Sequence, residues 1–176
     1  GGLIGLRLAA ATPERFSHLV IGNTALPFGE SLGPGFDFWL DISQTMDPFD
    51  CGALIARGAN EPLSEAEQNA YRAPFPDESF MAAAREFPCL VPITPEHGSV
   101  AENIAARAVL REWTDPVLLL WGTTDPVLGH LHDDFLDLIP GTAGQPHQLF
   151  EASHFIQDYV GAPLADAIVN WLADLR

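Results

Sequence analysis

Two ionisable residues stand at equivalent places in the last third of the sequence, each a few residues beyond a short apolar run. Asp125 lies in "WGTTDPVLG" and His154 lies in "LFEASHFIQDYVG". A carboxylate bound to one ring nitrogen of a histidine fixes the tautomer and stabilises the imidazolium, which leaves the other nitrogen free to take a proton. The pair is therefore a candidate base and acid. The alternatives are a turn carboxylate and a buried histidine ring with ordinary hydrogen bonds.

The elements around this pair alternate between strand and helix. Residues 115–122 ("DPVLLLWG") and 147–152 ("HQLFEA") are predicted as buried strands, joined by a helix over 130–141, and a last helix covers 162–175. Parallel strands joined by one crossover helix end side by side, so both loops are expected to meet where ligands bind in open α/β sheets. The order of acid, strand, histidine and final helix fits the last two members of an α/β-hydrolase triad.

The first residues, "GGLIGLRLAAATPERF", predict a helix that ends near Thr12-Pro13, before a strand within 17–27. The helix has no start signal, and two glycines lead directly into it, as they would after the nucleophile of a strand-to-helix elbow. We therefore expect that residues precede Gly1 in the natural protein and that the nucleophile lies two residues before it. The sequence has neither a signal-peptide pattern nor an apolar run of membrane-spanning length.

The middle of the chain, residues 25–113, is rich in proline and glycine and predicts helices but no convincing strand. Ser64 and Glu67 have the spacing of a helix capping box. The predicted fold class is α/β: the C-terminal part of an α/β-hydrolase fold, a parallel sheet flanked by helices, with an inserted helical cap. The predicted helices of the middle region span residues 63–73, 78–87 and 99–113. The predicted core consists of residues 1–24 and 114–176, and the predicted cap of residues 25–113.

Composition excludes several classes of function. The chain has 24 acidic and 8 basic residues, a net charge of −16, and no lysine. A field of this sign repels phosphate backbones and anionic lipids, so neither a nucleic-acid nor a membrane partner is expected. Cys51 and Cys89 lack metal-ligand spacing and are expected to be free thiols in a reducing, cytoplasmic compartment. His130 and His132 are interpreted as part of a solvated helix turn, so no metal site is predicted.

Other polar residues carry no functional prediction. His18, His97 and His147 have no partner that the sequence reveals, and Asn23, just beyond the first predicted strand, is interpreted as a residue that holds a turn.

Several stretches of the sequence together resemble the haloalkane dehalogenases, and most closely the subgroup whose acid follows the strand before the histidine. The resemblance covers nearly the whole chain, and "AYRAPFPDESF" and "HFIQ" are its most specific parts. The stretches that carry it are "GGLIGLRLAAATPERFSHLVIGNT", "GFDFWLDI", "LSEAEQNAYRAPFPDESFMAAAREFP", "LLLWGTTDPVLG" and "SHFIQDYVG".

This resemblance implies a cofactor-free reaction on a small halogenated hydrocarbon. An aspartate nucleophile displaces halide to form an alkyl-enzyme ester, and a water activated by histidine hydrolyses the ester to release the alcohol. Matched to the family, Asp125 is the acid of the triad and His154 the base. The nucleophile of the family is followed by tryptophan and two glycines, of which this sequence contains only Gly1 and Gly2.

The resemblance also implies a halide site. In this subgroup two indole N–H groups bind the ion, and Trp39 in "GFDFWLDI" matches the one from the cap. The alternative is that Trp39 only fills the cap interior. Phe36 and Phe38 beside it would keep the site apolar, which strengthens each N–H contact. The positions that match the substrate pocket are Phe36, Phe87, Pro88, Val91, Val127 and Leu128.

Other activities of the same fold remain open. An epoxide hydrolase shares the aspartate nucleophile but needs tyrosine O–H donors for the ring oxygen, and the chain has only Tyr71 and Tyr159. A serine-type esterase would need a serine at the elbow. The third possibility is that the 176 residues alone are an inactive fragment with an uncovered sheet edge. The sequence does not indicate an oligomeric state.

Overall fold

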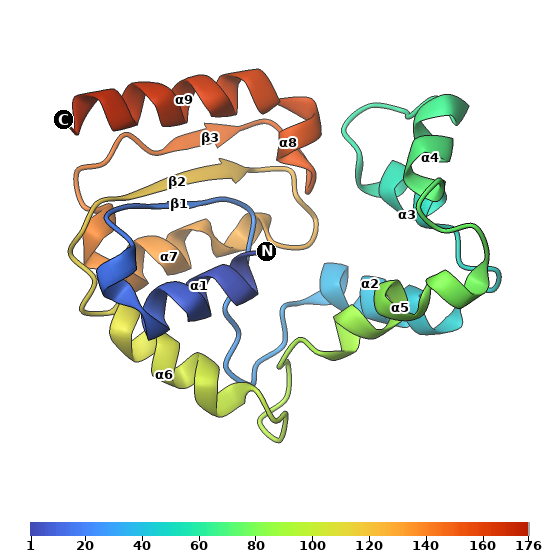
Figure 1. The fold of residues 1–176 in the computed structure, drawn as a ribbon, viewed down its shortest axis with the longest axis horizontal. Helices are drawn as coiled ribbons and strands as arrows, with labels where there is room; N and C mark the ends of the chain where they lie inside the picture. Colours follow the sequence, from blue (N-terminus) through green and yellow to red (C-terminus); the bar gives the residue numbers. More distant parts are fainter. Residues whose placement is uncertain (176) are drawn as a thin grey trace.

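The computed structural model describes residues 1–175 and contains a three-stranded parallel sheet with helices on both faces (Figure 1). The strand order is β1 (Leu19–Ile21), β2 (Val117–Gly122) and β3 (Gln148–Phe150). The first half of β2 pairs with β1 and its second half pairs with β3. The predicted α/β class is therefore confirmed, and β2 is the central strand.

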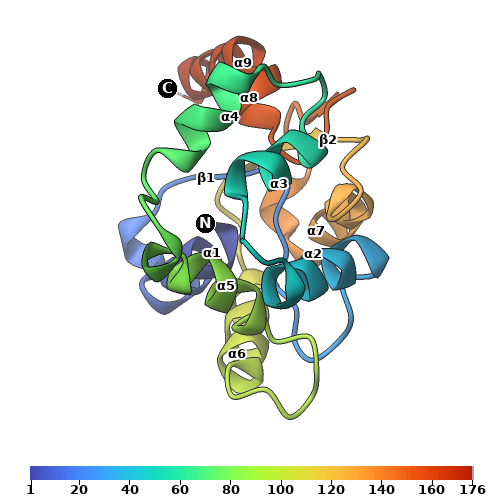
Figure 2. The same ribbon diagram turned by 90° about the vertical axis from the view of Figure 1, so that its right-hand side faces the viewer.

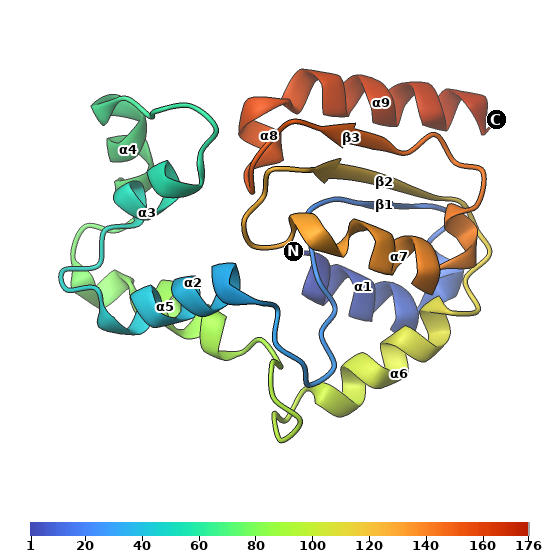
Figure 3. The same ribbon diagram turned by 180° about the vertical axis from the view of Figure 1, so that it is seen from behind.

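β2 is buried on both of its faces, which explains why its sequence is a continuous apolar run. Val117, Leu119 and Trp121 pack on one side, while Leu118 and Leu120 pack on the other. The first side is covered by α1, α6 and α7, and the second by α8 and α9, as opposite views of the molecule show (Figures 1 and 3). Full burial of an apolar side chain of this size contributes roughly 1.5–3 kcal/mol, so the sheet is stabilised chiefly through this strand.

The helices that pack on the sheet lie close to the predicted ranges. The final helix, predicted over 162–175, is found over Gly161–Asp174, and the predicted helix at 130–141 is shorter because it is flanked by 3₁₀ turns. None of the helices within residues 1–175 is long and apolar enough to span a membrane. The helices are α1 (Gly2–Ala11), α6 (Val100–Leu110), α7 (His132–Leu138), α8 (Ile156–Tyr159) and α9 (Gly161–Asp174).

Four further helices form a separate group beside the strand ends, which faces the viewer in Figure 2. We call α2 to α5 the cap helices; the domain boundaries of the sequence analysis stay a prediction. α2 packs on α5 and α3 packs on α4. The bounds of the cap helices are α2 (Pro34–Thr45), α3 (Cys51–Gly58), α4 (Glu65–Arg72) and α5 (Ala82–Cys89).

Side-chain hydrogen bonds cap the starts of α3, of α4 and of the 3₁₀ turn before α5. The capping box at the start of α4 is confirmed: Ser64 Oγ accepts from the Glu67 N–H at 3.3 Å, and Glu67 Oε2 accepts from the Ser64 N–H at 2.8 Å. The single helix predicted over 78–87 is wrong in its first turn. Asp77 caps a separate 3₁₀ turn over Glu78–Phe80, and α5 begins only after it.

Arginine links the cap helices to one another. Arg72 of α4 donates to both carboxylate oxygens of Asp50 at 2.8 Å, and Asp50 in turn caps α3. Hydrogen bonds from Arg72 lower the pKa of Asp50. Arg85 of α5 donates to the carbonyl oxygens of Ser43 and Met46, at the end of α2. Bidentate and multiple arginine contacts fix geometry, so these bonds hold each helix pair together.

Candidate active site

The candidate pair of the sequence analysis is in direct contact. His154 Nδ1 lies 2.9 Å from Asp125 Oδ2, across the two loops that follow β3 and β2. The Asp125 side chain is fully buried, whereas 32% of the His154 side chain is exposed. A carboxylate at this nitrogen favours the tautomer with the proton on Nδ1. His154 Nε2 makes no hydrogen bond to any residue in 1–175, and it is therefore the nitrogen that can accept a proton.

The Asp125 carboxylate is held from three directions. Besides His154, the Val127 N–H donates to Oδ1 at 2.7 Å and the Asn23 side-chain amide donates to Oδ2 at 2.8 Å. Burial raises the pKa of Asp125, but the hydrogen bond and charge of His154 and the backbone N–H groups of Val127 and Leu128 outweigh it, so the pKa is lowered. The ionised carboxylate therefore stabilises the fold above about pH 4, and this contribution is lost as the pH falls through the lowered pKa.

Asn23 is a site residue that the sequence analysis missed. Its amide donates to Asp125, while its carbonyl oxygen accepts from the Gly122 N–H at 2.7 Å, so it joins the ends of β1 and β2. Its φ of 34° is in the left-handed region, which asparagine tolerates better than most residues. The interpretation as a turn residue was incomplete. A polar residue at the carboxyl end of a predicted parallel strand was the available signal.

The two loops of the site approach closely because β2 ends in glycine. A Cβ atom at Gly122 would lie 2.5 Å from the Ala152 carbonyl oxygen, which no side chain allows. The Thr123 and Thr124 N–H groups donate to the carbonyl oxygens of Phe150 and Ala152 at 2.9 and 3.1 Å. We call residues 123–128 the acid loop and residues 151–155 the histidine loop. The acid loop is thus bonded along the start of the histidine loop, and this contact brings Asp125 within reach of His154.

Apolar side chains from the cap helices and the acid loop meet in one cluster beside this pair. We call it the cap cluster; its buried members include Phe36, Val91 and Leu128, and Trp39 and Val127 pack against it. Five of the residues assigned to the halide site and pocket are therefore brought together. The Phe36 and Trp39 rings meet edge to face, with centroids 5.5 Å apart. Trp39 is half-buried, and its indole N–H makes no hydrogen bond to the residues the structure describes.

Two aromatic residues, Phe87 and Phe38, lie outside the cap cluster. Phe87 on α5 is 63% exposed, and Pro88 beside it is buried. Phe38 is 49% exposed and has the Arg57 guanidinium 5.9 Å from its ring centroid, so it does not line the cluster as expected. Phe36 and Phe38 are two positions apart on α2, and residues so spaced face different sides of a helix.

His132 is not part of a solvated turn, so that interpretation was wrong. Its side chain is 14% exposed and packs edge to face on Trp121, with ring centroids 5.9 Å apart. His147, for which no partner was predicted, accepts from the Leu119 N–H at 3.0 Å, and its other nitrogen contacts the Thr142 carbonyl oxygen at 2.9 Å. Burial lowers the pKa of His147, which keeps it neutral. Residues 1–175 contain no cluster of three or more metal-ligating side chains.

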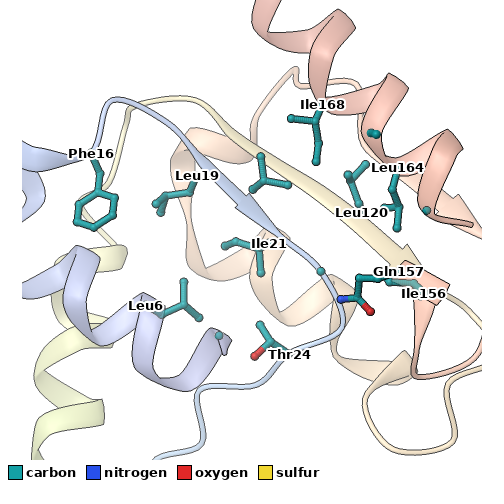
Figure 4. A pocket seen from close by; sticks show the side chains of 16 residues that line it. Leu6, Phe16, Leu19, Ile21, Thr24, Leu120, Ile156, Gln157, Leu164 and Ile168 are labelled. Carbon is teal, nitrogen blue, oxygen red and sulfur yellow. The ribbon is translucent and has the colours of Figure 1, made fainter. Parts of the chain in front are cut away.

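A groove of about 660 Å³ runs along the free edge of β1, between α1 and α9 (Figure 4). Its walls are apolar, with Leu6, Ile21 and Leu120 among them, and Thr24 and Gln157 are the polar side chains at one end. None of its lining residues is ionisable, so the groove has no group that could act as acid or base. The candidate chemistry lies at the strand ends instead.

Comparisons with known proteins identify close relatives. The chain is 43% identical over 176 residues to a haloalkane dehalogenase of Psychrobacter cryohalolentis, and the alignment covers 99% of this chain and 58% of that relative. It is 41% identical over 172 residues to a haloalkane dehalogenase of Mycobacterium marinum, and this alignment covers 97% of this chain and 58% of the relative. The chain thus spans less than two thirds of the length of these relatives. No family model matches it.

A solved structure agrees with the sequence comparison. The tetrameric haloalkane dehalogenase DpaA of Paraglaciecola agarilytica superposes with a TM-score of 0.82 at 26% identity, over 98% of this chain and 56% of that one. Both comparisons cover both candidate loops and the cap helices, because they include nearly every residue of the chain.

Proposed function

From the premise that this chain has the α/β-hydrolase fold and matches haloalkane dehalogenases along nearly its whole length, we propose that it supplies the base and the acid of a hydrolytic dehalogenase. The observation that carries the proposal is the contact between His154 Nδ1 and the buried Asp125 carboxylate, with Nε2 left free. The substrate would be a haloalkane, and the products an alcohol and a halide ion.

The proposed reaction has two steps. A carboxylate nucleophile attacks the carbon that bears the halogen, a C–O bond forms as the carbon–halogen bond breaks, and the halide leaves with the bonding electrons. His154 Nε2 then takes a proton from water, and the resulting hydroxide attacks the carbonyl carbon of the ester. The imidazolium returns the proton to the departing alkoxide, so the alcohol is released and the nucleophile is left as a carboxylic acid. This acid loses its proton to solvent, which restores the carboxylate. Asp125 stabilises the imidazolium during this second step.

We place the nucleophile, an aspartate, in a segment that precedes Gly1. Support comes from the close contact at the start of α1: a Cβ atom at Gly2 would lie 2.0 Å from Thr24 Oγ1, so only glycine fits between the helix start and the end of β1. A helix start that packs this closely against the end of a neighbouring strand is expected at a nucleophile elbow. The apolar groove along β1 would then receive the strand that carries this aspartate.

We propose that Trp39 binds the departing halide. Its indole N–H is not used by the described residues, and it lies against the apolar cap cluster. An N–H donor in a site that excludes water stabilises developing negative charge far better than one in solvent. Phe36, Val91, Val127 and Leu128 would then form the wall that accommodates the alkyl chain, whereas Phe87, being exposed, has weaker support.

An epoxide hydrolase is the main alternative and is less well supported. The Tyr71 hydroxyl donates to the Asp158 carboxylate, which removes it as a free donor, and Tyr159 on α8 is 48% exposed. Neither tyrosine lies in the cap cluster, where an epoxide oxygen would need its O–H donors.

The test uses the full-length protein that contains this chain. We expect halide release from a short dihaloalkane over many turnovers. The His154→Gln variant should release about one halide per protein and then stop, because ester formation needs the carboxylate while hydrolysis needs the base. The measurement is stopped-flow halide release, with mass spectrometry of the trapped ester. Sustained turnover by the variant, or hydrolysis of an epoxide in place of the haloalkane, would contradict the proposal.

A further inference from the structure

The loop that carries His154 is held by the cap helices as well as by the core. The connection between α3 and α4 lies beside this loop, and the view toward the cap shows the two segments together (Figure 2). The Asn60 carbonyl oxygen accepts from the Ser153 N–H at 2.6 Å, and the Asn60 amide lies 3.5 Å from the Glu151 carbonyl oxygen. One asparagine side chain thus contacts two consecutive peptide groups directly before the histidine.

The peptide group between Ala152 and Ser153 is therefore fixed at both ends. Its carbonyl oxygen accepts from the Thr124 N–H of the acid loop at 3.1 Å, and its N–H donates to Asn60 of the cap. A planar peptide that is bonded on both sides cannot rotate without breaking one of these bonds. His154 is one residue beyond Ser153, so the orientation of this peptide constrains the direction in which the chain enters His154.

Two further contacts join the same segments. The Tyr71 hydroxyl of α4 donates to Asp158 of α8, and this bond raises the pKa of Tyr71. Gly58 lies so close to Phe155 that a Cβ atom there would be 2.8 Å from the ring. The contacts come from α3, α4 and their connection and reach residues on both sides of His154. They therefore support a defined arrangement of this loop against the cap.

We propose that Asn60 is a positioning residue for the base: through the Ser153 peptide it aims His154 Nε2 at the hydrolytic water. The inference rests on the proposed function, because it assigns Asn60 to the second of the two steps. In this role Asn60 acts through the Ser153 peptide and not on the ester or the halide itself. Its loss should slow hydrolysis of the ester and leave ester formation unchanged.

The test compares Asn60→Leu, Asn60→Asp and Asn69→Leu in the full-length protein. Leucine has a similar size but no hydrogen-bonding atoms, whereas aspartate keeps an oxygen for the Ser153 N–H. Asn69 is a matched control, since it is an exposed asparagine on α4 whose side-chain oxygen accepts a hydrogen bond from Arg72 of the same helix. A small misalignment at a reacting centre costs up to about 10²-fold in rate, and we expect about a tenfold fall in kcat for Asn60→Leu.

The kinetic pattern separates positioning from damage to the fold. If only hydrolysis slows, kcat and KM fall together, kcat/KM stays within about twofold, and the first turnover remains a full burst. Asn60→Asp should recover most of kcat, and Asn69→Leu should match the wild type. A fall in kcat and kcat/KM at constant KM, with a smaller burst, would indicate loss of folded protein and overturn the inference.

A second readout does not depend on activity. The proton on His154 Nδ1, bonded to Asp125, should give a downfield proton NMR signal, which should move in Asn60→Leu and return in Asn60→Asp. A wild type that releases no halide would refute the proposed function, and the NMR signal would still decide whether Asn60 positions the ring. An active wild type with unchanged kcat, KM and ring signal in Asn60→Leu would refute the role of Asn60 alone.

Discussion

The hydrogen-bonded group of Asp125, His154 and Asn23, which we call the acid and base corner, is held by different forces from the cap cluster. Asp125 is fully buried and accepts hydrogen bonds from a backbone N–H, an asparagine and His154, so its position is determined by directional contacts. The cap cluster is apolar, and the indole N–H of Trp39 has no partner in the described part of the chain. Hydrogen bonds fix atoms within a few tenths of an ångström, whereas apolar packing tolerates changes of shape. The first region suits chemistry and the second suits choice of substrate.

Replacing the acid should have the largest effect. Asp125→Asn keeps the size of the side chain but can present an N–H to His154, which favours the wrong tautomer. We expect kcat to fall about 10³-fold, with ester formation retained. Steady-state and single-turnover halide release measure the two steps. The matched control is Asp133→Asn, an exposed carboxylate that contacts His132, which should stay within twofold of the wild type. A kcat for Asp125→Asn within tenfold of the wild type would show that another group performs this role.

Replacing the proposed halide donor should have the next largest effect and act on the other step. Trp39→Phe keeps the ring but removes the N–H, and loss of one such donor costs about 10²-fold in rate. We expect slower ester formation, a weaker quench of tryptophan fluorescence by bromide, and an unchanged rate of ester hydrolysis. Trp113→Phe is the control, because Trp113 is buried in the core and its indole N–H has no hydrogen-bond partner among residues 1–175. If bromide binds Trp39→Phe as tightly as the wild type, Trp39 is only a packing residue.

The sequence predicted those parts of the fold that local patterns determine. β2 is an unbroken apolar run and α9 a long amphipathic helix, and both were found within a few residues of the predicted bounds. The four-residue α8 is too short for a period to show, and its existence depends on packing of Ile156 in the core. α2 and α3 were likewise not specified, since Asp50 caps α3 with support from Arg72, a residue of another helix.

The site was predictable where the chain order itself carries the information. Asp125 and His154 each follow a strand, so parallel topology alone brings them together. The hydrogen-bond partners of Asn23 and the packing of His132 were not predictable, because these contacts come from other elements. Asn23 bonds to Gly122 and Asp125, about a hundred residues away, and His132 packs on Trp121. Tertiary contacts of this kind leave no local pattern in a single sequence.

Removing the Asn23 side chain should lower both stability and kcat, with an effect on kcat smaller than that of Asp125→Asn. In Asn23→Leu the Gly122 N–H loses its acceptor inside the protein, which costs about 1–3 kcal/mol of stability. Asp125 keeps two of its three hydrogen bonds, so we expect kcat to fall about tenfold, much less than in Asp125→Asn. Chemical denaturation and steady-state halide release measure both effects. The comparison is sharpened by Asn23→Asp, which keeps the acceptor for Gly122 but places a second carboxylate beside Asp125. A loss of activity in Asn23→Leu as large as in Asp125→Asn would mean that Asn23 itself takes part in the reaction.

The smallest effect is expected from a phenylalanine at the edge of the cap. Phe87 is 63% exposed, whereas Phe36 is 2% exposed within the cap cluster, so the two positions offer the same chemical change in different surroundings. Phe36→Ala should destabilise the protein by about 3–5 kcal/mol because it leaves a cavity. Phe87→Ala should cost about 0.5 kcal/mol or less and change kcat less than twofold. Thermal unfolding and kcat/KM for haloalkanes of increasing length test both. A strong dependence on chain length in Phe87→Ala would place that ring in the pocket wall, as the sequence suggested, and would mean that the cap moves over the substrate when it binds.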